Sequence, residues 1–175
     1  MTEIDFHGGE IRIRMIGPAD APKLIAGIEE LSSATRFGRF FFLKTGFSTE
    51  ELHTLTCCDG ISHFALVAEL ASEPECPLVA VGRWIRDAAD PAIADFALVV
   101  RDDWQRHGVG TVLTQLIAQE AGKKGIVRFR AQTLWGNTAV IKLLESVGTL
   151  VEQLPIGSGA SESIFKLRSD LEIKT

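Results

Sequence analysis

The sequence contains no tyrosine and few residues of the kinds that build disulfide-bonded or metal-bound scaffolds. Its 175 residues include three cysteines and two methionines. Cys57 and Cys58 are adjacent and Cys76 is the third, which is an odd number without the spacing of metal ligands. We therefore expect no disulfide framework and no metal site. We interpret the cysteines as buried, reduced thiols of a cytoplasmic protein.

A surplus of positive charge and long apolar runs are also missing. The chain carries 18 Lys and Arg against 23 Asp and Glu, a net charge of −5, and has no run of basic residues. This balance argues against nucleic acid as a partner. No apolar segment reaches the length of a membrane span, and Glu3 and Asp5 stand where a signal peptide would be basic, so we expect no membrane partner. We expect residues 1–175 to form one domain, as a monomer or a homodimer.

The most informative stretch joins an apolar strand to a glycine-containing turn and a helix. Phe96–Val100 is a continuous apolar run, as expected of a strand covered on both faces. Gly108 and Gly110 follow, at the start of a helical apolar stripe formed by Val109, Val112, Leu113, Leu116 and Ile117. The first amide N–H groups of a helix have no partner within it, and glycine lets a ligand approach them. The junction therefore predicts a phosphate-binding site.

The spacing of the glycines distinguishes among phosphate ligands. Gln105, Gly108 and Gly110 form Gln-x-x-Gly-x-Gly, which differs from the Gly-x-Gly-x-x-Gly of dinucleotide sites and lacks the Gly-Lys-Ser/Thr of triphosphate sites. The pattern resembles the pyrophosphate loop of the GNAT (GCN5-related) N-acetyltransferases, which bind acetyl-CoA. The resemblance implies acetyl-CoA contacts from Leu98, Val99, Val100, Gln105, Arg106, His107, Gly108, Val109, Gly110, Thr111 and Asn137. Within this set it implies that the backbone of Val99 and Val100 pairs with pantetheine, and that His107 is a variable, solvent-exposed position.

The order of elements along the chain also resembles the GNAT fold. Apolar periodicity and capping signals predict strands near 10–15, 63–70, 78–85, 92–100, 126–134, 150–154 and 164–167, and helices near 20–31, 48–55, 109–122 and 137–147. The fold expected is α/β (α+β), with a mixed central sheet of six to seven strands flanked by about four helices. Thr35–Lys44 is basic and aromatic. We expect a short helix whose phenylalanines fill the core, and the alternative is a wall of a substrate groove.

Two further patterns narrow the resemblance. Asn137 and Gly148 have the spacing of a second family signature, in which Asn137 would cap a helix and also touch the pantetheine–pyrophosphate arm. Ile11–Arg14 and Thr35–Phe41 resemble the bacterial protein-lysine acetyltransferase branch. The resemblance implies an N-acetyltransferase that transfers an acetyl group directly from acetyl-CoA to a primary amine, a protein lysine in the first place. The alternatives are a small-amine N-acetyltransferase and an acyl-CoA-binding module with little turnover.

Catalysis needs a base, because a lysine amine is uncharged only about one time in a thousand at pH 7. Asp95 is the candidate, since Ala94–Asp95–Phe96–Ala97 stands where this branch has Ala-Glu-x-Ala. The shorter side chain favours proton relay through water. Phe96 and Trp84 predict a desolvated carboxylate with a raised pKa, and the alternative is that Asp95 opens the strand and faces solvent.

The absence of tyrosine affects how the departing CoA thiolate can be protonated. Many members of the family use a tyrosine to protonate the departing CoA thiolate, and Leu143 and Leu144 occupy the corresponding region here. Because an ordinary thiol has a pKa of about 8.5, the thiolate can leave unaided or through water.

Overall fold

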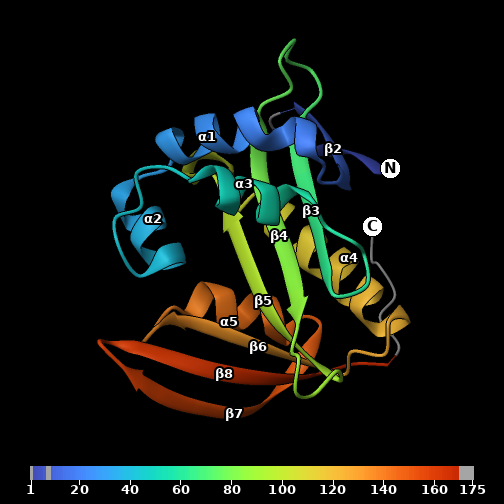
Figure 1. The fold of residues 1–175 in the computed structure, drawn as a ribbon, viewed down its shortest axis with the longest axis vertical. Coiled ribbons are helices and arrows are strands. Elements are labelled where there is room, and N and C mark those ends of the chain that lie inside the picture. Colours follow the sequence, from blue (N-terminus) through green and yellow to red (C-terminus); the bar gives the residue numbers. More distant parts are fainter. Residues whose placement is uncertain (1, 7–8, 170–175) are drawn as a thin grey trace.

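The sheet organises the whole molecule. Figure 1 shows the computed structural model, which describes residues 2–6 and 9–169. The sheet order is β1-β2-β3-β4-β5-β6-β8-β7, antiparallel throughout except for the parallel pair β5–β6. The strands are β1 (Thr2–Phe6), β2 (Gly9–Met15), β3 (His63–Leu70), β4 (Leu78–Arg86), β5 (Ile93–Val100), β6 (Arg128–Leu134), β7 (Gly148–Gly157) and β8 (Ala160–Leu167).

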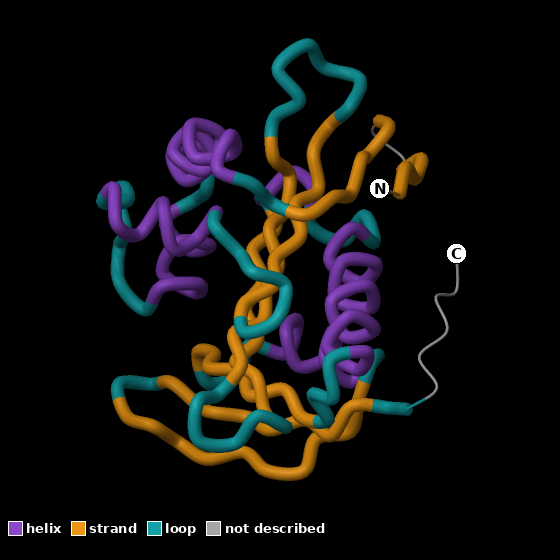
Figure 2. Tube along the Cα trace, turned by 45° about the vertical axis from the view of Figure 1, so that its right-hand side comes forward, coloured by secondary structure: helices purple, strands orange, loops and turns teal. Residues whose placement is uncertain are grey.

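Helices cover both faces of this sheet, as Figure 2 shows for the first part of the chain on one side and α4 on the other. The helices are α1 (Ala21–Glu30), α2 (Ser33–Phe40), α3 (Thr49–Thr56), α4 (Val109–Lys123) and α5 (Thr138–Glu145), with short 3-10 turns η1 (Pro18–Asp20) and η2 (Asp102–Trp104). Alternate residues of one strand face opposite cores. Phe64 and Leu66 belong to the cluster around α4, whereas Ala65 and Val67 pack with α1 and α3. A strand buried on both faces therefore appears in the sequence as a continuous apolar run.

The sheet opens between β5 and β6. These strands are registered only from Ile93 to Asp95 on β5 and from Arg128 to Arg130 on β6. Beyond this point β5 stays with β4 and β6 stays with β8, so the two strands diverge, as is visible at the centre of Figure 1. The second half of β5 consequently has one edge without a neighbouring strand. This opening positions the candidate site.

The fold class predicted from the sequence is confirmed, with differences in detail. The described residues form eight strands and five α-helices, because the short edge strand β1 pairs with β2 and residues 33–40, which overlap the aromatic segment Thr35–Lys44, form the separate helix α2. The expectation that this segment fills the core is wrong. No residue of α2 is buried, and Phe37 is 45% exposed, because α2 lies over the opening of the sheet against β5 and β6. The expectation of buried thiols is also wrong, since Cys57 is exposed and the other two cysteines are only partly covered.

A buried ion-pair network joins the first strands to α1. Glu69 on β3 is 3% exposed and accepts hydrogen bonds from Arg14 at 2.7 Å and from Lys23 at 3.0 Å. Arg14 also forms two bonds of 2.7 Å to the buried Asp20. Burial alone raises the pKa of Glu69 and of Asp20, but the hydrogen bonds from these cations outweigh it, so that both pKa values are lowered.

We expect Glu69→Ala to lower the free energy of unfolding by about 3–5 kcal/mol, because it leaves Arg14 and Lys23 without their shared carboxylate. The lowered pKa values also predict that the free energy of unfolding decreases at acid pH. The network stabilises the protein above the ordinary carboxylate pKa of about 4, and the stability is lost as pH falls through the lower folded-state value. Urea unfolding at a series of pH values measures both effects. Glu120→Ala, which breaks the surface pair with Lys123, is the control and should cost less than about 1 kcal/mol. Equal losses in the two variants would contradict the prediction.

Candidate active site

The loop before α4 presents a row of free amide groups. Arg106 and Gly108 adopt left-handed conformations, with φ of 62° and 90°. Within the described chain, none of the amide N–H groups from 106 to 111 donates a hydrogen bond, and Val112 is the first to do so, to the Gly108 carbonyl at 3.1 Å. These donors stand at the positive end of a 15-residue helix. The arrangement fits a diphosphate, which combines negative charge with several acceptor oxygens.

Apolar anchors and one amide hold this loop in place. Trp104 and Val109 are buried on either side of it, so Val109 offers a ligand its backbone alone. The Gln105 side chain donates from Nε2 to the Val100 carbonyl at 3.2 Å, which ties the loop to the end of β5. His107 is exposed, as predicted, and its Nδ1 lies 2.9 Å from the Gln105 carbonyl oxygen.

The same loop is tied to α2. Asp102 accepts from the Ser32 amide at 2.9 Å, from the Ser32 hydroxyl at 2.7 Å and from the Thr35 hydroxyl at 2.7 Å. Gln105 also donates to the Thr35 hydroxyl at 3.3 Å. Partial burial raises the pKa of Asp102, but these hydrogen bonds outweigh it and lower the pKa overall. The N-terminus of α2 and the predicted phosphate loop are thus one connected unit.

A cavity of about 330 Å³ occupies the opening between β5 and β6. Asp95 and Ala97 line it on the α2 side, together with Arg39 of α2. Phe96, Leu98 and Val140 line it on the side of α4 and α5. The cavity therefore connects the two faces of the sheet. A volume of this size is within the range of ligand pockets.

The free edge of β5 leads from the loop into this cavity. The Arg101 amide donates to Val79 of β4 at 2.8 Å, whereas the Val100 carbonyl faces the open side and accepts from Gln105. Because main-chain groups alternate in direction along a strand, Leu98 faces the open side as well and Val99 faces β4. This corrects the expectation for Val99, whose backbone is directed toward β4. Leu98 and Val100 can pair with an extended ligand as an added strand would.

Gly110 lies where the end of β5 approaches α5. A Cβ at this position would lie 3.4 Å from Val100, 3.5 Å from Leu98 and 3.6 Å from Leu143 of α5. Any larger side chain would fill the space between β5 and α5. Leu143 of α5 therefore faces the end of β5 across Gly110. Asn137 is the N-cap of α5, and its Oδ1 accepts from the Val140 amide at 3.5 Å, as predicted.

Asp95 lies at the point where β5 and β6 separate, opposite Arg130 of β6. Its carboxylate is 53% exposed and its Oδ1 accepts from Arg130 Nε at 2.5 Å. Trp84 and Phe96 are on the other face of the sheet, so the predicted desolvated environment is wrong. Asp95 is the third residue of β5 rather than its start, although it does face solvent. Among the described residues, no donor forms a hydrogen bond to Oδ2.

Arg130 is shared between two carboxylates. Its Nη2 donates to Asp87 at 2.8 Å. The hydrogen bond to Asp95 is the larger cause, and with that to Asp87 it raises the pKa of Arg130, although partial burial works in the opposite direction. The cation therefore holds Asp95 at the mouth of the cavity through one oxygen.

Sequence reasoning missed Arg83, which lines the same cavity from β4. It is 5% exposed, and its Nη1 donates to the Leu55 carbonyl at 3.2 Å and lies 3.1 Å from His63 Nε2. Burial, together with the positive charge of Arg39, lowers the pKa of Arg83 to about 10. Burial, and then the charge of Arg83, lowers the pKa of His63 to about 4, so His63 is uncharged at neutral pH. The available signal was one charged residue inside the apolar run 78–85.

Among the described residues, no group of three or more His, Cys, Asp or Glu could hold a metal ion. Nor is any helix among those residues both long and apolar enough to cross a membrane.

Comparisons with known proteins agree with this geometry. The acetyltransferase Pat of Mycolicibacterium smegmatis is 28% identical over 138 residues, which are 79% of this chain and 40% of that protein. The chain thus spans less than half the length of this curated relative. The crystal structure of the GNAT domain of S. lividans PAT superposes with a TM-score of 0.81 at 27% identity, covering 95% of this chain and 96% of that one.

A more distant structure shows the same fold. The structure of yncA from Salmonella typhimurium with its cofactor acetyl-CoA superposes with a TM-score of 0.66 at 16% identity, covering 93% of this chain and 95% of that one. The sequence profile of the Acetyltransferase (GNAT) family matches residues 41–149, which include β3 to α5 and the loop before α4. The chain therefore belongs to the Acetyltransferase (GNAT) family.

Proposed function

We propose that this enzyme transfers an acetyl group from acetyl-CoA to the side-chain amine of a protein lysine. One observation carries the proposal: the free amides of the loop 106–111, the open edge of β5 and the Asp95 carboxylate lie one after another along β5, beside the cavity in the sheet. In this arrangement the loop amides bind the diphosphate, and the backbone of Leu98 and Val100 aligns the pantetheine arm. Asp95 then stands at the far end of the cavity, where the acceptor amine meets the thioester.

The chemistry follows from this alignment. The uncharged amine nitrogen attacks the thioester carbonyl carbon, the new C–N bond forms, and the C–S bond breaks with release of the CoA thiolate. The free oxygen Oδ2 of Asp95 accepts the proton of the ammonium form, directly or through one water. The sequence has no tyrosine to protonate the thiolate, so it leaves as the anion or takes a proton from water.

Similarity and surface both support a protein acceptor. The chain resembles the protein-lysine acetyltransferase branch and is similar to the acetyltransferase Pat. The aromatic segment expected to be core lies at the surface beside the cavity, where Phe37, Phe42 and Leu43 are exposed. Exposed apolar residues of this kind suit the backbone and side chains of a polypeptide. We further propose that residues 1–175 act as one domain, in the cytoplasm, where its three free cysteines stay reduced.

One experiment separates this proposal from its alternatives. The protein is incubated with radiolabelled acetyl-CoA and either a protein lysate or a panel of small amines. Label on protein lysines is the expected result. Label on small amines alone would make the enzyme a small-amine acetyltransferase. Retained CoA binding without label in any acceptor would make it an acyl-CoA-binding module.

A further inference from the structure

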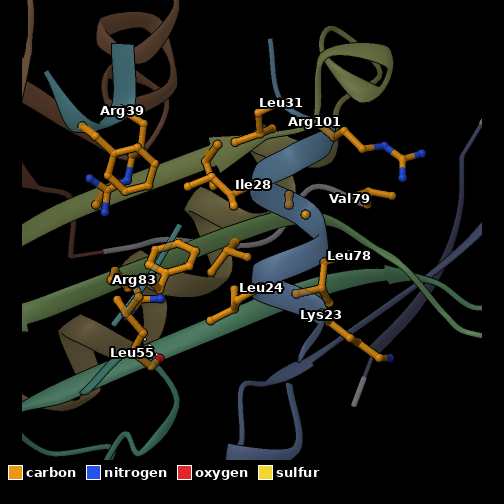
Figure 3. A pocket seen from close by; sticks show the side chains of 17 residues that line it. Lys23, Leu24, Ile28, Leu31, Arg39, Leu55, Leu78, Val79, Arg83 and Arg101 are labelled. Carbon is orange, nitrogen blue, oxygen red and sulfur yellow. Dashed lines mark hydrogen bonds between the residues drawn. The ribbon is translucent and has the colours of Figure 1, made fainter. Parts of the chain in front are cut away.

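Two arginines of the cavity have no carboxylate partner. Five cations line the cavity between β5 and β6 or the smaller pocket of about 70 Å³ beside it under α1. Three of them are paired: Lys23 with Glu69, Arg101 with Glu30 and Asp103, and Arg130 with Asp87 and Asp95. Among the described residues, no acidic side chain pairs with Arg39 or Arg83. Figure 3 shows these two at one end of the smaller pocket, with Lys23 and Arg101 at the other.

Arg83 is buried, and some of its N–H donors have no hydrogen-bond partner among the described residues. The Leu55 carbonyl and the uncharged His63 ring contact Nη1 alone. Within the described chain, Nε and Nη2 make no hydrogen bond, although the residue is 5% exposed and lines both cavities. A buried cation without a counter-ion is costly, and a guanidinium presents its donors in a fork that matches carboxylate and phosphate oxygens.

Arg39 adds a second cation at the same place. It lies on α2 and also lines both cavities. Its guanidinium carbon is 5.0 Å from the centre of the Phe40 ring, which orients the side chain without neutralising it. Two unpaired cations on facing elements, one on β4 and one on α2, form a site for a negative group.

We propose that Arg39 and Arg83 bind an anionic group of the acceptor, a carboxylate or a phosphate carried close to the lysine that is acetylated. The inference rests on the proposed lysine acceptor. Both arginines line the cavity that Asp95 lines, on the α2 side of the sheet, whereas no residue of the loop 106–111 lines it and Leu98 lines it from the opposite side. The anion therefore belongs to the acceptor and not to CoA. A lysine next to an acidic or phosphorylated residue is the substrate class selected.

The test compares peptides that share one lysine and differ at neighbouring positions. Each position is occupied in turn by Glu, Gln or phosphoserine, and kcat/KM is measured with saturating acetyl-CoA. At the best position we expect Glu or phosphoserine to exceed Gln by about tenfold or more, mainly through KM, since charge-assisted bonds are formed. A higher kcat/KM for the phosphoserine peptide than for the Glu peptide would identify a phosphate as the natural group. A higher kcat/KM for the Glu peptide would identify a carboxylate. In Arg39→Met and in Arg83→Met, the ratio of kcat/KM for the Glu or phosphoserine peptide to kcat/KM for the Gln peptide should fall toward one.

Arg36→Met is the matched control. Arg36 lies on α2 one turn before Arg39 and outside the residues that line the two cavities, so the same loss of charge should leave the ratio unchanged. Methionine suits the apolar surroundings of Arg83, and Arg39→Met provides the same test should Arg83→Met fail to fold. Near-equal rates for Glu, Gln and phosphoserine peptides at every position would overturn the inference. An undiminished preference in both pocket variants would overturn it as well.

A binding measurement separates this inference from the proposed function. With CoA saturating the loop, glutarate should raise the melting temperature relative to chloride at equal ionic strength. The rise should disappear in Arg39→Met and Arg83→Met and persist in Arg36→Met. If no lysine peptide is acetylated and this pattern is still seen, the anion site stands and the lysine acceptor is wrong. If peptides are acetylated without preference and glutarate has no effect, the acceptor is right and the anion site is wrong.

Discussion

We expect Gly108→Val to bind acetyl-CoA at least about 100-fold more weakly than the unaltered protein, a loss of about 2.7 kcal/mol. Gly108 has a φ of 90°, a conformation that a β-branched residue adopts at high cost. The variant must therefore either move the loop or hold it under strain with a side chain among the free amides. In both cases the donors from 106 to 111 no longer converge on one diphosphate. Isothermal titration with acetyl-CoA measures the effect.

Gly125→Val is the matched control for this experiment. Gly125 lies just beyond the other end of α4 with a φ of 78°, and a Cβ there has open space around it. The substitution imposes a similar backbone penalty far from the loop. It should lower the melting temperature and leave the dissociation constant for acetyl-CoA within about twofold. A Gly108→Val protein that binds acetyl-CoA normally would show that the diphosphate is held elsewhere.

Local patterns in the sequence were sufficient to predict most of the fold. The apolar runs of β3, β4 and β5, the capping box that starts α3 and the glycines before α4 each depend on residues close together in the chain. The loop before α4 is an example of a feature that depends on neighbouring residues alone. Its free amides follow from one strand, one turn and one helix, so the sequence alone predicted them correctly.

Errors arose where a residue's surroundings come from distant parts of the chain. The aromatic segment of α2 has the composition of a core helix, but it lies over the gap between β5 and β6, which the sequence does not show. Asp95 is adjacent in sequence to Phe96, yet strand alternation places the two on opposite faces and Arg130 beside Asp95. Sequence periodicity predicts which residues share a face, but not which partner meets them there.

The enclosed position of Arg83 also could not be predicted from the sequence. A single arginine in an apolar strand suggests a surface position, since antiparallel sheets commonly have one solvated face. In this fold β4 is covered on both faces, so that the arginine is enclosed with His63 and Arg39. Its role depends on the pairing of β4 with β3 and on the position of α2, and both are set by long-range contacts.

The second large effect concerns Asp95. We expect Asp95→Ala to lower kcat by about 10²-fold or more, with the affinity for acetyl-CoA changed by less than about twofold. The reason is geometric: the Asp95 carboxylate lies at the α2 side of the cavity, away from the loop 106–111, and its Oδ2 is free to take the proton of the acceptor. The difference in kcat between Asp95→Ala and the unaltered enzyme should become smaller as the pH approaches about 10.4. At that pH a growing fraction of the acceptor lysine is uncharged without help from a base. Steady-state rates across pH, together with titration of acetyl-CoA, measure both quantities.

Two variants separate proton transfer from the ion pair with Arg130. Asp95→Glu keeps the carboxylate and should retain most of the activity, since the longer side chain reaches further into the cavity. Asp87→Asn removes the other carboxylate partner of Arg130 and leaves Asp95 in place, so its kcat should fall far less than that of Asp95→Ala. If Asp87→Asn and Asp95→Ala lose the same activity, the role of Asp95 is to hold Arg130. If Asp95→Ala keeps the normal rate at every pH, the acceptor proton leaves by another route and Asp95 is not the base.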